Sequence, residues 1–391
     1  MAERPVSEAN KSGSTRQEPN GPEQSAPSPG RFVSLGEHQR ETKAAYEADA
    51  AGWTRRAVEP GQTELAKKLR ADSSGLCLDL GCGPGWHLDL LAPSVGLDLS
   101  REMTKLAHKH GPVVQGDLTV LPFARESIGG IWASRTIVHL PRTEVPAALA
   151  EMHRVMKSDA TAHIWLFEGD DEAVQFDNDS LPGRTFSYWP PELLRRTLEG
   201  AGFRVDEFTR WEAPTKSGVP IGQIIASVTR LWSLPDYVSS GMKLLICGLN
   251  PSPGSADSGV GFHRAGNRFW PAAIQAGLVT RDRDPRHALA EHGVGMTDMV
   301  KRPTRRADEV DRTEFEAGFE RLDRLCEWLQ PDRICIVGLA GWRQAVDRKA
   351  QRGWQTQTLG GRPVYLMPST SGLNAHDTID SLGDHLRAAT S

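Results

Sequence analysis

The sequence has no apolar run close to the roughly 20 residues of a membrane helix, which excludes a spanning helix of ordinary length. Its first residues, MAERPVSEANKSGS, lack the apolar segment of a secretory signal, so we expect a cytoplasmic protein. The five cysteines form no CxxC pair and no cluster with histidine, which predicts reduced thiols and no bound metal. We expect a monomer that makes no contact with membranes.

A strong net charge is also missing, since the formal balance is −4 and gives no general indication of nucleic-acid binding. A local basic cluster, KRPTRR, does occupy residues 301–306, and it would suit a phosphate backbone. Acidic residues follow at 308–311, so an ordinary solvated face remains the alternative.

Changes in composition divide the 391 residues into a tail and two domains. Residues 1–36 are rich in Ser, Pro, Gly and Glu and have little to bury, which predicts a disordered tail. Strand-like and helix-like segments then alternate over residues 37–232, the pattern of a doubly wound parallel sheet. Turn residues gather near 231–241, and the apolar segments KLLICGL, RICIVGL and PVYLMPS predict a second three-layer α/β domain over 240–391.

Each domain contains an apolar strand that opens into a glycine-rich loop. In LCLDLGCGPG, three glycines leave room for a ligand to lie against the backbone, and Asp98 follows about 20 residues later, where a carboxylate can bind ribose hydroxyls. In LLICGLNPSPG no Lys-Ser/Thr pair follows the glycines, which excludes a phosphate-binding P-loop. Asn250 stands just beyond this strand, and its amide can hold a water because it donates and accepts at once.

The first domain resembles the S-adenosylmethionine-dependent methyltransferases of the seven-stranded, Rossmann-like class. The resemblance rests on the glycine spacing, on the carboxylate before it and on the segment QGD at residues 115–117. It implies S-adenosylmethionine as the cofactor, with a nicotinamide site or a loop that holds no ligand as the alternatives. The implied cofactor-binding residues are Asp79, Gly81, Gly83, Gly85, Asp98 and Asp117.

The sequence leaves the methyl acceptor open. Enzymes that methylate exocyclic amines of DNA bases carry Asn or Asp, two prolines and an aromatic residue, and this motif is absent from ASRTIVHLP at residues 133–141. The cysteine beside proline that cytosine-C5 methylation requires is absent as well. Arg135, His139 and Trp165 are candidates to face an acceptor, although each of them could simply be packed in the domain.

The second domain resembles the mismatch-specific uracil-DNA and thymine-DNA glycosylases of the uracil-DNA glycosylase superfamily. Four segments carry the resemblance in the right order: LLICGLNPSPG, SGVGFHRAGNRFW, TDMVKRPTRRADEV and MPSTSGLNA. Such enzymes bind double-stranded DNA and rotate a mismatched nucleotide out of the helix. The resemblance implies that Asn250 positions the attacking water, that the base stacks on Phe262, and that Leu373 fills the hole in the duplex. It further implies substrate contacts at Gly248, Ser369, Ser371, Gly372 and Asn374.

The chain departs from the most active members of this superfamily in the first of these segments. They carry Asp-Pro-Tyr where this chain has Asn-Pro-Ser, so we predict slower catalysis and room for the methyl group of thymine. No lysine occupies the motif, which predicts hydrolysis to an abasic site without strand cleavage and without a cofactor. Asn267 and Arg268 are expected to brace their loop, and Ala375 stands where some bacterial relatives carry arginine.

Taken together, the residues predict an α/β protein of two domains, a Rossmann-like seven-stranded methyltransferase fold followed by a three-layer α/β/α glycosylase-like fold. The predicted function is that of a bifunctional fusion: a glycosylase that releases uracil, thymine or modified cytosine mispaired with guanine, joined to a methyltransferase of unknown acceptor. The alternative is a module that binds mismatched or damaged DNA without cleaving it and targets a methyltransferase or a sensor of S-adenosylmethionine.

Overall fold

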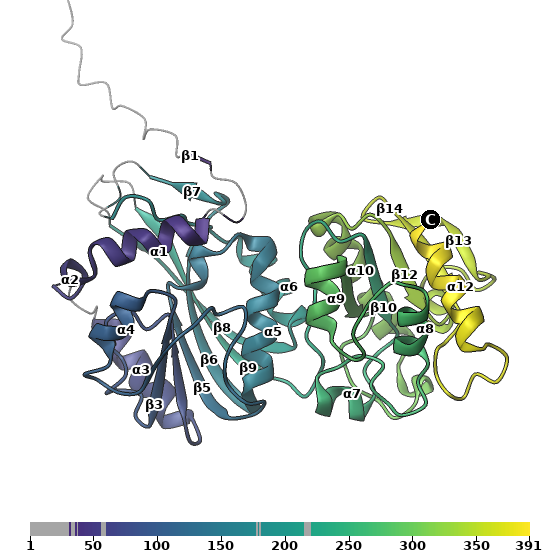
Figure 1. Ribbon diagram of the computed structural model, residues 1–391, viewed down its shortest axis with the longest axis horizontal. Coiled ribbons are helices and arrows are strands. Elements are labelled where there is room, and N and C mark those ends of the chain that lie inside the picture. Colours follow the sequence, from purple (N-terminus) through teal and green to yellow (C-terminus); the bar gives the residue numbers. More distant parts are fainter. Residues whose placement is uncertain are drawn as a thin grey trace, which may run out of the picture.

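The computed structural model describes residues 31–32, 36, 38–55, 60–176, 179, 181–214 and 220–391. Most of the predicted disordered tail therefore lies outside the described residues. Figure 1 shows the two domains side by side, with the first domain in purple to teal and the second in green to yellow.

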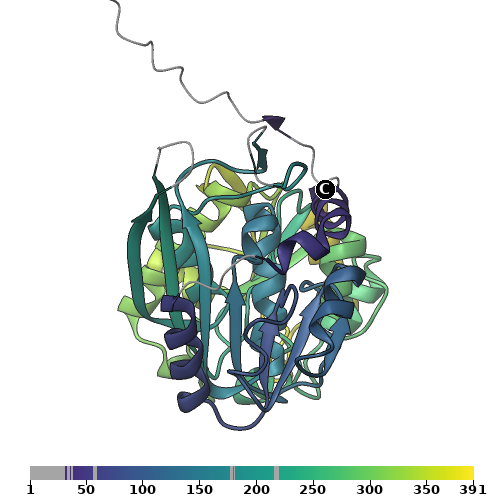
Figure 2. The same cartoon turned by 90° about the vertical axis from the view of Figure 1, so that its left-hand side faces the viewer.

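A seven-stranded sheet forms the centre of the first domain, in the order β4-β3-β2-β5-β6-β9-β8. Only β9 runs antiparallel to its neighbours. Figure 2, in which this domain faces the viewer, shows helices on both sides of the twisted sheet. The prediction of a seven-stranded Rossmann-like fold is confirmed. The elements are β1 (Arg31–Phe32), α1 (His38–Ala48), α2 (Ala50–Trp53), α3 (Pro60–Asp72), β2 (Cys77–Leu80), β3 (Ser94–Asp98), α4 (Arg101–Ala107), β4 (Val113–Gln115), β5 (Ile128–Ser134), η1 (Ile137–His139), η2 (Arg142–Glu144), α5 (Val145–Val155), β6 (Met156–Glu168), β7 (Val174–Gln175), α6 (Pro191–Gly200), β8 (Phe203–Ala213) and β9 (Ile221–Arg230).

The second domain has a five-stranded sheet in the order β11-β10-β12-β14-β13, parallel except at the edge strand β13. The three strands expected from the sequence are β10, β12 and β14, and they lie at its centre. The elements are β10 (Leu244–Gly248), α7 (Pro253–Ser258), α8 (Phe269–Gln275), α9 (Pro285–His292), β11 (Val294–Asp298), η3 (Ala307–Glu309), α10 (Arg312–Leu329), β12 (Ile334–Val337), α11 (Ala340–Ala345), β13 (Gly353–Leu359), β14 (Arg362–Met367) and α12 (Ile379–Thr390).

Alternate residues of β10 enter two different cores. Leu244 and Ile246 belong to a cluster with residues of α8 and α12, whereas Leu245 and Cys247 belong to a cluster with residues of α10. Successive side chains of a strand point to opposite faces, so a strand with no polar residue must be covered by helices on both sides. The predicted three-layer α/β/α arrangement is therefore confirmed.

Helices α5 and α6 of the first domain lie next to the second domain (Figure 1). The carboxylate of Glu151 in α5 is 1% exposed and accepts hydrogen bonds from the backbone N–H of Leu121 and from Arg154. It also pairs at 3.2 Å with Arg286 in α9 of the second domain. A buried charge with partners on both sides ties the two domains together.

The segment between the domains is packed against the second domain through Asp236, which is 4% exposed. Its carboxylate accepts hydrogen bonds from Thr297 Oγ1 at 2.6 Å, Lys301 Nζ at 2.9 Å and Arg321 Nη1 at 2.9 Å. Burial acts to raise the pKa of Asp236, but Lys301 and Arg321 outweigh burial and hold the pKa below its usual range. Removing this carboxylate would leave two cationic groups without their common partner.

We predict that Asp236→Asn lowers the free energy of unfolding by about 3 kcal/mol, as measured by urea denaturation of the full chain. The folded pKa lies below the unfolded value, so this stabilisation is present above pH ~4 and is lost as the pH falls through the folded pKa. The difference between wild type and variant should therefore shrink on acidification. Asp308→Asn, which removes an exposed partner of Arg306, is the control and should leave the urea midpoint unchanged. Equal effects of both substitutions would contradict the role of burial.

Candidate functional sites

A cavity of about 1020 Å³ opens at the carboxyl ends of the strands of the first domain. This edge is where open α/β sheets bind their ligands. The cavity lining includes five of the six predicted cofactor residues, namely Asp79, Gly81, Gly83, Asp98 and Asp117. Gly85 is outside this lining. A Cβ atom there would lie 3.0 Å from the Cα of Ala107 in α4, so close packing of the loop explains this glycine, and its contact with the cofactor stays a prediction.

The glycine-rich loop is held in place by the carboxylate of Asp98. Its Oδ2 accepts a hydrogen bond from Gly83 N and its Oδ1 accepts one from Ser100 N, both at 2.8 Å. Gly81 and Gly83 have φ angles of +69° and +53°, which favour glycine. A Cβ on Gly81 would also lie 2.1 Å from Thr136 Oγ1, so no larger residue fits there.

Two carboxyl groups at the cavity differ in their surroundings: Asp79 is buried and has one oxygen without a partner, whereas Asp98 is half-buried and both of its oxygens accept hydrogen bonds. Burial, together with the nearby Asp98, raises the pKa of Asp79 to about 8, and its Oδ2 has no hydrogen-bond partner among the described residues. Burial also raises the pKa of Asp98 to about 6, although the N–H groups of Ser100 and Gly83 oppose this. Buried acceptors without partners are costly, which indicates that a ligand supplies cationic or hydrogen-bonding groups here. S-adenosylmethionine carries an ammonium group and ribose hydroxyls, which are donors that these carboxyl groups can accept from.

The remaining residue of the predicted cofactor set is fixed at the same cavity. Oδ1 of Asp117 accepts hydrogen bonds from the backbone N and from Oγ1 of Thr119, both at 2.8 Å. A carboxylate held in this way keeps its position toward the cavity, so its orientation does not have to be set by the ligand.

Two of the three acceptor candidates line this cavity, Arg135 and His139. Trp165 is outside the lining, because its Nε1 donates to Gln223 Oε1 at 2.8 Å and its ring lies 4.2 Å below the guanidinium of Arg135. The sequence reasoning missed Tyr46 of α1, which also lines the cavity. The only signal for that residue was the helical composition of its segment, and composition does not say which helical face meets a cavity.

In the second domain, Asn250 follows β10 and its side chain is held by the loop that follows β11. Nδ2 donates to the backbone oxygen of Arg302 at 3.0 Å and to Thr304 Oγ1 at 2.8 Å. A backbone oxygen can only accept a hydrogen bond, so the atom of Asn250 that faces Arg302 O must be Nδ2 and the other must be Oδ1. The donors of Asn250 are thus engaged with the protein, and Oδ1 is its acceptor side.

Two side chains approach Gly248 at the end of the same strand. A Cβ on Gly248 would lie 2.4 Å from Asp298 Oδ1 and 3.5 Å from Phe262 Cζ, which explains the glycine. Phe262 has a φ of +57°, a strained conformation of the kind that gathers at functional sites, and its ring stacks on Phe269 with centroids 4.3 Å apart. The structure therefore brings the predicted residue Phe262 to Gly248, two residues before Asn250 in the chain.

The sequence reasoning missed Asp298, the last residue of β11, which pairs with Gly248 across the sheet and is 9% exposed. Burial raises its pKa to about 6, while Lys301 acts in the opposite direction. Its segment, VGMTD, contains a glycine and two polar residues, so its composition does not predict a strand there. Recognising that strand would have revealed a carboxylate at the same sheet edge as Asn250.

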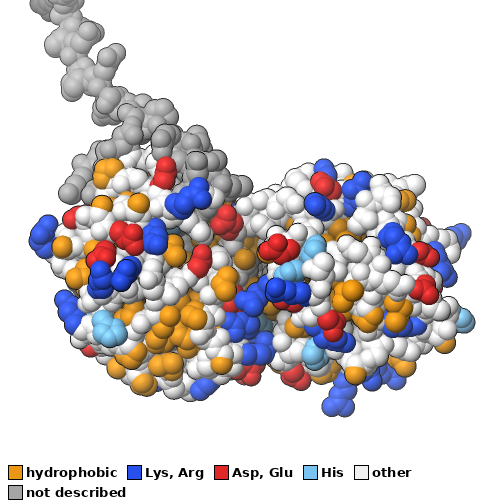
Figure 3. All heavy atoms as spheres, in the orientation of Figure 1, with side chains coloured by type: hydrophobic (Ala, Val, Ile, Leu, Met, Phe, Trp, Pro, Cys, Tyr) orange, Lys and Arg blue, Asp and Glu red, His pale blue; other side chains and the backbone are white. Residues whose placement is uncertain are grey.

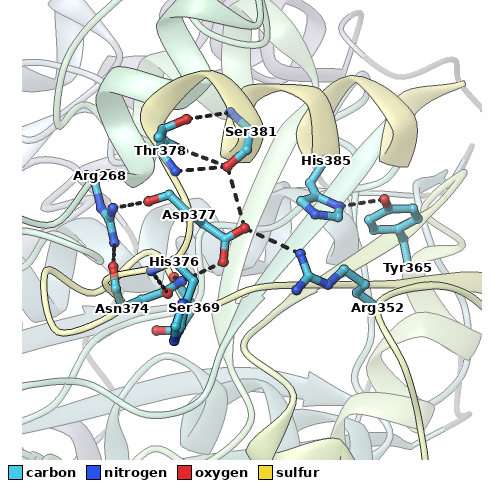
Figure 4. A network of polar contacts seen from close by, with 10 residues as sticks. All are labelled: Arg268, Arg352, Tyr365, Ser369, Asn374, His376, Asp377, Thr378, Ser381 and His385. Carbon is cyan, nitrogen blue, oxygen red and sulfur yellow. Dashed lines mark hydrogen bonds and ion pairs between the residues drawn. The ribbon is translucent and has the colours of Figure 1, made fainter.

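Leu373 is 88% exposed, so its side chain does not pack into the domain. The loop that presents it is braced by Arg268, whose guanidinium donates to the backbone oxygens of Ser371, Asn374 and Asp377. Figure 4 shows this guanidinium pointing toward Asn374 and Asp377. The expected bracing role of Arg268 agrees with these contacts.

The side-chain amide of Asn374 is engaged with its own loop. Its Nδ2 donates to Ser369 O at 2.8 Å and to Asp377 Oδ2 at 2.9 Å, and its Oδ1 accepts from His376 N (Figure 4). These bonds give Asn374 a role in shaping the loop. Oδ1 keeps a second lone pair, so the substrate contact stays a prediction.

The other predicted residues of this loop keep groups that a substrate can use. Ser369 Oγ accepts from Ser371 N and Ser371 Oγ accepts from Leu373 N, both at 3.3 Å. Because each hydroxyl acts as acceptor in these bonds, its own O–H can still donate. A Cβ on Gly372 would lie 3.1 Å from Gly266 O, so the loop packs closely at that residue.

The basic cluster at residues 301–306 is largely paired with acidic side chains. Lys301 points inward to Asp236, Arg302 bonds to Glu314, and Arg306 bonds to Asp308. Figure 3 likewise shows red and blue side chains interspersed on the visible face of the second domain. The idea of a row of free cations along a phosphate backbone is therefore not supported for these three residues.

No group of His, Cys, Asp or Glu side chains is placed to hold a metal ion within the part of the chain that the structure describes. All five cysteines are buried and none forms a disulfide. Of the described helices, none combines the length and the apolar composition needed to cross a membrane.

Comparison with known families assigns the two domains. Residues 78–164 match the family described as methyltransferase domain, and residues 235–388 match the uracil DNA glycosylase superfamily. The chain therefore joins a methyltransferase domain to a domain of the uracil DNA glycosylase superfamily. The methyltransferase match and the lining of the cavity support S-adenosylmethionine as the cofactor of the first domain, and glycosylases of the second domain's superfamily need none.

Several solved structures resemble part of this chain. A Burkholderia thailandensis 1,6-didemethyltoxoflavin-N1-methyltransferase with bound S-adenosylhomocysteine is 18% identical and has a TM-score of 0.42, and the match covers 53% of this chain and 94% of that one. A Methanosarcina mazei S-adenosylmethionine-dependent methyltransferase is 18% identical with a TM-score of 0.38, covering 45% and 99%. A Thermotoga maritima methyltransferase, described as a possible histamine N-methyltransferase, is 17% identical with a TM-score of 0.36, covering 48% and 99%.

We predict that the affinity for S-adenosylhomocysteine falls as the pH is lowered through about 6, because only the charged form of Asp98 accepts two ribose hydroxyls. Asp98→Asn should bind about 10-fold more weakly at neutral pH and should lose this pH dependence. Calorimetry at several pH values measures both effects. Asp89→Asn, which alters a largely exposed carboxylate, is the control and should bind like wild type. A wild-type affinity that is independent of pH would contradict the role of Asp98.

Proposed function

We propose that this chain is a bifunctional fusion of a mismatch-directed uracil/thymine-DNA glycosylase and an S-adenosylmethionine-dependent methyltransferase. The observation that carries the glycosylase half is the fixed amide of Asn250 at the carboxyl end of β10. Because its Nδ2 is engaged with Arg302 and Thr304, Oδ1 accepts a hydrogen bond from a water molecule. That bond turns a lone pair of the water toward the anomeric carbon of a nucleotide rotated out of double-stranded DNA.

Rotation of the nucleotide leaves a hole in the duplex, and the exposed Leu373 is the apolar side chain that fills it. The rotated base stacks on the half-buried ring of Phe262, which Phe269 supports from behind. The hydroxyl groups of Ser369 and Ser371 donate hydrogen bonds to the DNA phosphate or to the guanine that has lost its pairing partner. A mismatched pair costs least to open, which favours G:U and G:T substrates.

Asp298 adds base selection to this site. Its carboxylate accepts a hydrogen bond from N3–H of uracil or thymine, whereas N3 of cytosine carries no proton. The same negative charge opposes the anion that develops on the departing base, so selection is obtained at the expense of rate. This trade agrees with the slow catalysis that the Asn-Pro-Ser segment predicts.

In the first domain, the cofactor supplies an electrophilic methyl group when bound. Asp79 would pair with its ammonium group, Asp98 would accept hydrogen bonds from its ribose, and Asp117 would contact its adenine. The glycines at 81 and 83 let the backbone approach it closely. We retain the predictions of a cytoplasmic monomer and of mismatched double-stranded DNA as the partner of the second domain.

We expect Asn250→Ala to lower base release from a G:U duplex at least about 100-fold while leaving duplex affinity within about twofold. The reason is that alanine cannot orient the water, although it leaves the DNA-binding loops unchanged. Alkali treatment followed by gel electrophoresis measures release, and fluorescence anisotropy measures affinity. Thr304→Val, which removes one acceptor of the Asn250 amide, should cause a smaller loss. Cleavage by Asn250→Ala at the wild-type rate would refute the mechanism, and binding without release by the wild type would favour the non-cleaving module.

Asp298→Asn should raise the single-turnover rate on G:U about 10-fold at pH 7.5, because the amide carries no charge opposite the developing anion. The wild-type rate should rise as the pH falls through about 6, where Asp298 becomes protonated, and the variant should lack this rise. Selectivity against G:C should fall in the variant. Asp384→Asn, at an exposed carboxylate of α12, serves as the control. A large loss of rate in Asp298→Asn would show that the carboxylate is required.

A further inference from the structure

The cavity of the first domain extends beyond the residues that hold the cofactor. The cofactor residues lie in or just after β2, β3 and β4. Other lining residues lie at the ends of β5 and β6, which are on the other side of β2 in the strand order. A single ligand of drug size occupies a site of about 300–1,000 Å³. The cavity of about 1020 Å³ is at the upper end of this range and has room for a second, small molecule beside the cofactor.

Aromatic rings line this second part of the cavity, which we name the aromatic chamber. Four rings from β6 and the segment after it contact one another with centroids 5.4–6.3 Å apart. They belong to Phe167, Phe176, Phe186 and Tyr188. Rings in such offset and tilted arrangements present flat apolar faces, which suit a planar aromatic ligand.

A tyrosine and a histidine form a hydrogen-bonded pair at this chamber. His139 Nδ1 lies 2.8 Å from the backbone oxygen of Thr185, which can only accept, so Nδ1 carries the proton. In the neutral imidazole Nε2 is then the acceptor, and it receives the O–H of Tyr46 at 2.9 Å. The Tyr46 oxygen in turn accepts from Arg184 Nη1 at 3.1 Å. A neutral imidazole with an acceptor nitrogen next to a phenol is an arrangement for moving a proton.

The environment keeps the phenol of Tyr46 protonated. Burial raises the pKa of Tyr46, although Arg184 acts in the opposite direction. The ion pair between Arg184 and Asp179, in which Arg184 Nε donates to Asp179 Oδ2 at 2.8 Å, holds the guanidinium in place. A neutral phenol can pass its proton to His139 while it accepts one from a ligand.

The charges that line the whole cavity indicate which kind of acceptor it excludes. Apart from the three carboxyl groups assigned to the cofactor, three carboxylates and three cationic side chains line the cavity. A nucleic-acid strand binds through an excess of cations that neutralise its phosphates, and this balanced lining offers no such excess, which disfavours DNA or RNA as the acceptor. The carboxylates are Glu168, Asp171 and Asp179, and the cations are Lys43, Arg135 and Arg184.

We propose that the aromatic chamber binds a small, uncharged aromatic molecule with a hydroxyl group, and that Tyr46 and His139 remove its proton during methylation. The acceptor oxygen bonds to the methyl carbon, the carbon–sulfur bond breaks with its electrons going to sulfur, the acceptor proton passes to Tyr46, and the Tyr46 proton passes to His139. His139 thereby becomes an imidazolium and returns its proton to solvent. This inference rests on the proposed methyltransferase function.

The binding test uses the full chain saturated with S-adenosylhomocysteine, with 2-naphthol as the probe and 2-methoxynaphthalene as its partner without an O–H donor. Calorimetry should show 2-naphthol binding at least about 10-fold more tightly. Tyr46→Phe should lower the affinity for 2-naphthol to that for 2-methoxynaphthalene. The same variant should keep the affinity for S-adenosylhomocysteine within about twofold of wild type. Tyr365→Phe is the matched control, because Tyr365 also bonds to a histidine, His385, but in the second domain. It should leave the binding of both naphthalene probes unchanged.

A second measurement separates proton removal by His139 from a purely structural role. His139→Gln should bind 2-naphthol within about twofold of wild type but transfer methyl groups at least about 100-fold more slowly at neutral pH. The loss should diminish at alkaline pH, where 2-naphthol ionises without a base. A loss that is equal at every pH would overturn the role of His139.

The outcomes distinguish the inference from the function on which it rests. Failure to bind S-adenosylhomocysteine would remove the proposed methyltransferase function itself. Binding of S-adenosylhomocysteine without any preference for 2-naphthol over its methyl ether would overturn the acceptor class alone. Transfer of the methyl group to a single-stranded or duplex oligonucleotide, with no competition from 2-naphthol, would overturn it in favour of a nucleic-acid acceptor.

Discussion

The chemistry of both domains depends on one constraint of parallel sheets. Their strands are covered by helices on both faces, so polar side chains on these strands lie mainly at their ends. In the first domain Asp98 ends β3, and in the second domain Asp298 ends β11. The loops that follow neighbouring strands meet at the same edge, which brings Asn250 to Thr304 and Gly81 to Thr136. Two unrelated activities thus use the same part of two similar architectures.

Buried carboxylates recur in this protein, and their surroundings give them different roles. Asp236 is surrounded by Lys301, Arg321 and Thr297 and stabilises the join between the domains. Asp79 has an oxygen without a partner and is suited to a cationic ligand. The same side chain therefore serves stability where the protein supplies its partners and binding where the ligand must supply them.

The two domains are also connected close to the glycosylase site. Arg125 of the first domain donates to Ala256 O at 2.9 Å, and Trp232 donates to Asp257 Oδ1 at 2.9 Å. Both acceptors lie in α7, the helix that begins at Pro253, three residues after Asn250. The first domain thus braces the helix that follows the Asn250 loop, a contact that an isolated second domain would lack.

The sequence by itself determined the two α/β domains, because apolar runs, glycine turns and amphipathic helices are local patterns that burial enforces wherever they occur. It also located Asp98, Asn250 and Leu373, since each stands next to such a pattern. Only the tertiary structure placed Asp298, because β11 contains Gly295 and two polar residues and is stabilised by pairing with β10 more than by its own composition. Only the tertiary structure joined Tyr46 to His139, 93 residues apart. A contact between a helix and a distant loop produces no repeating pattern in the sequence, so the sequence alone does not predict it. The turn of Asn374 into its own loop was decided in the same way, by hydrogen-bond partners that become neighbours only after folding.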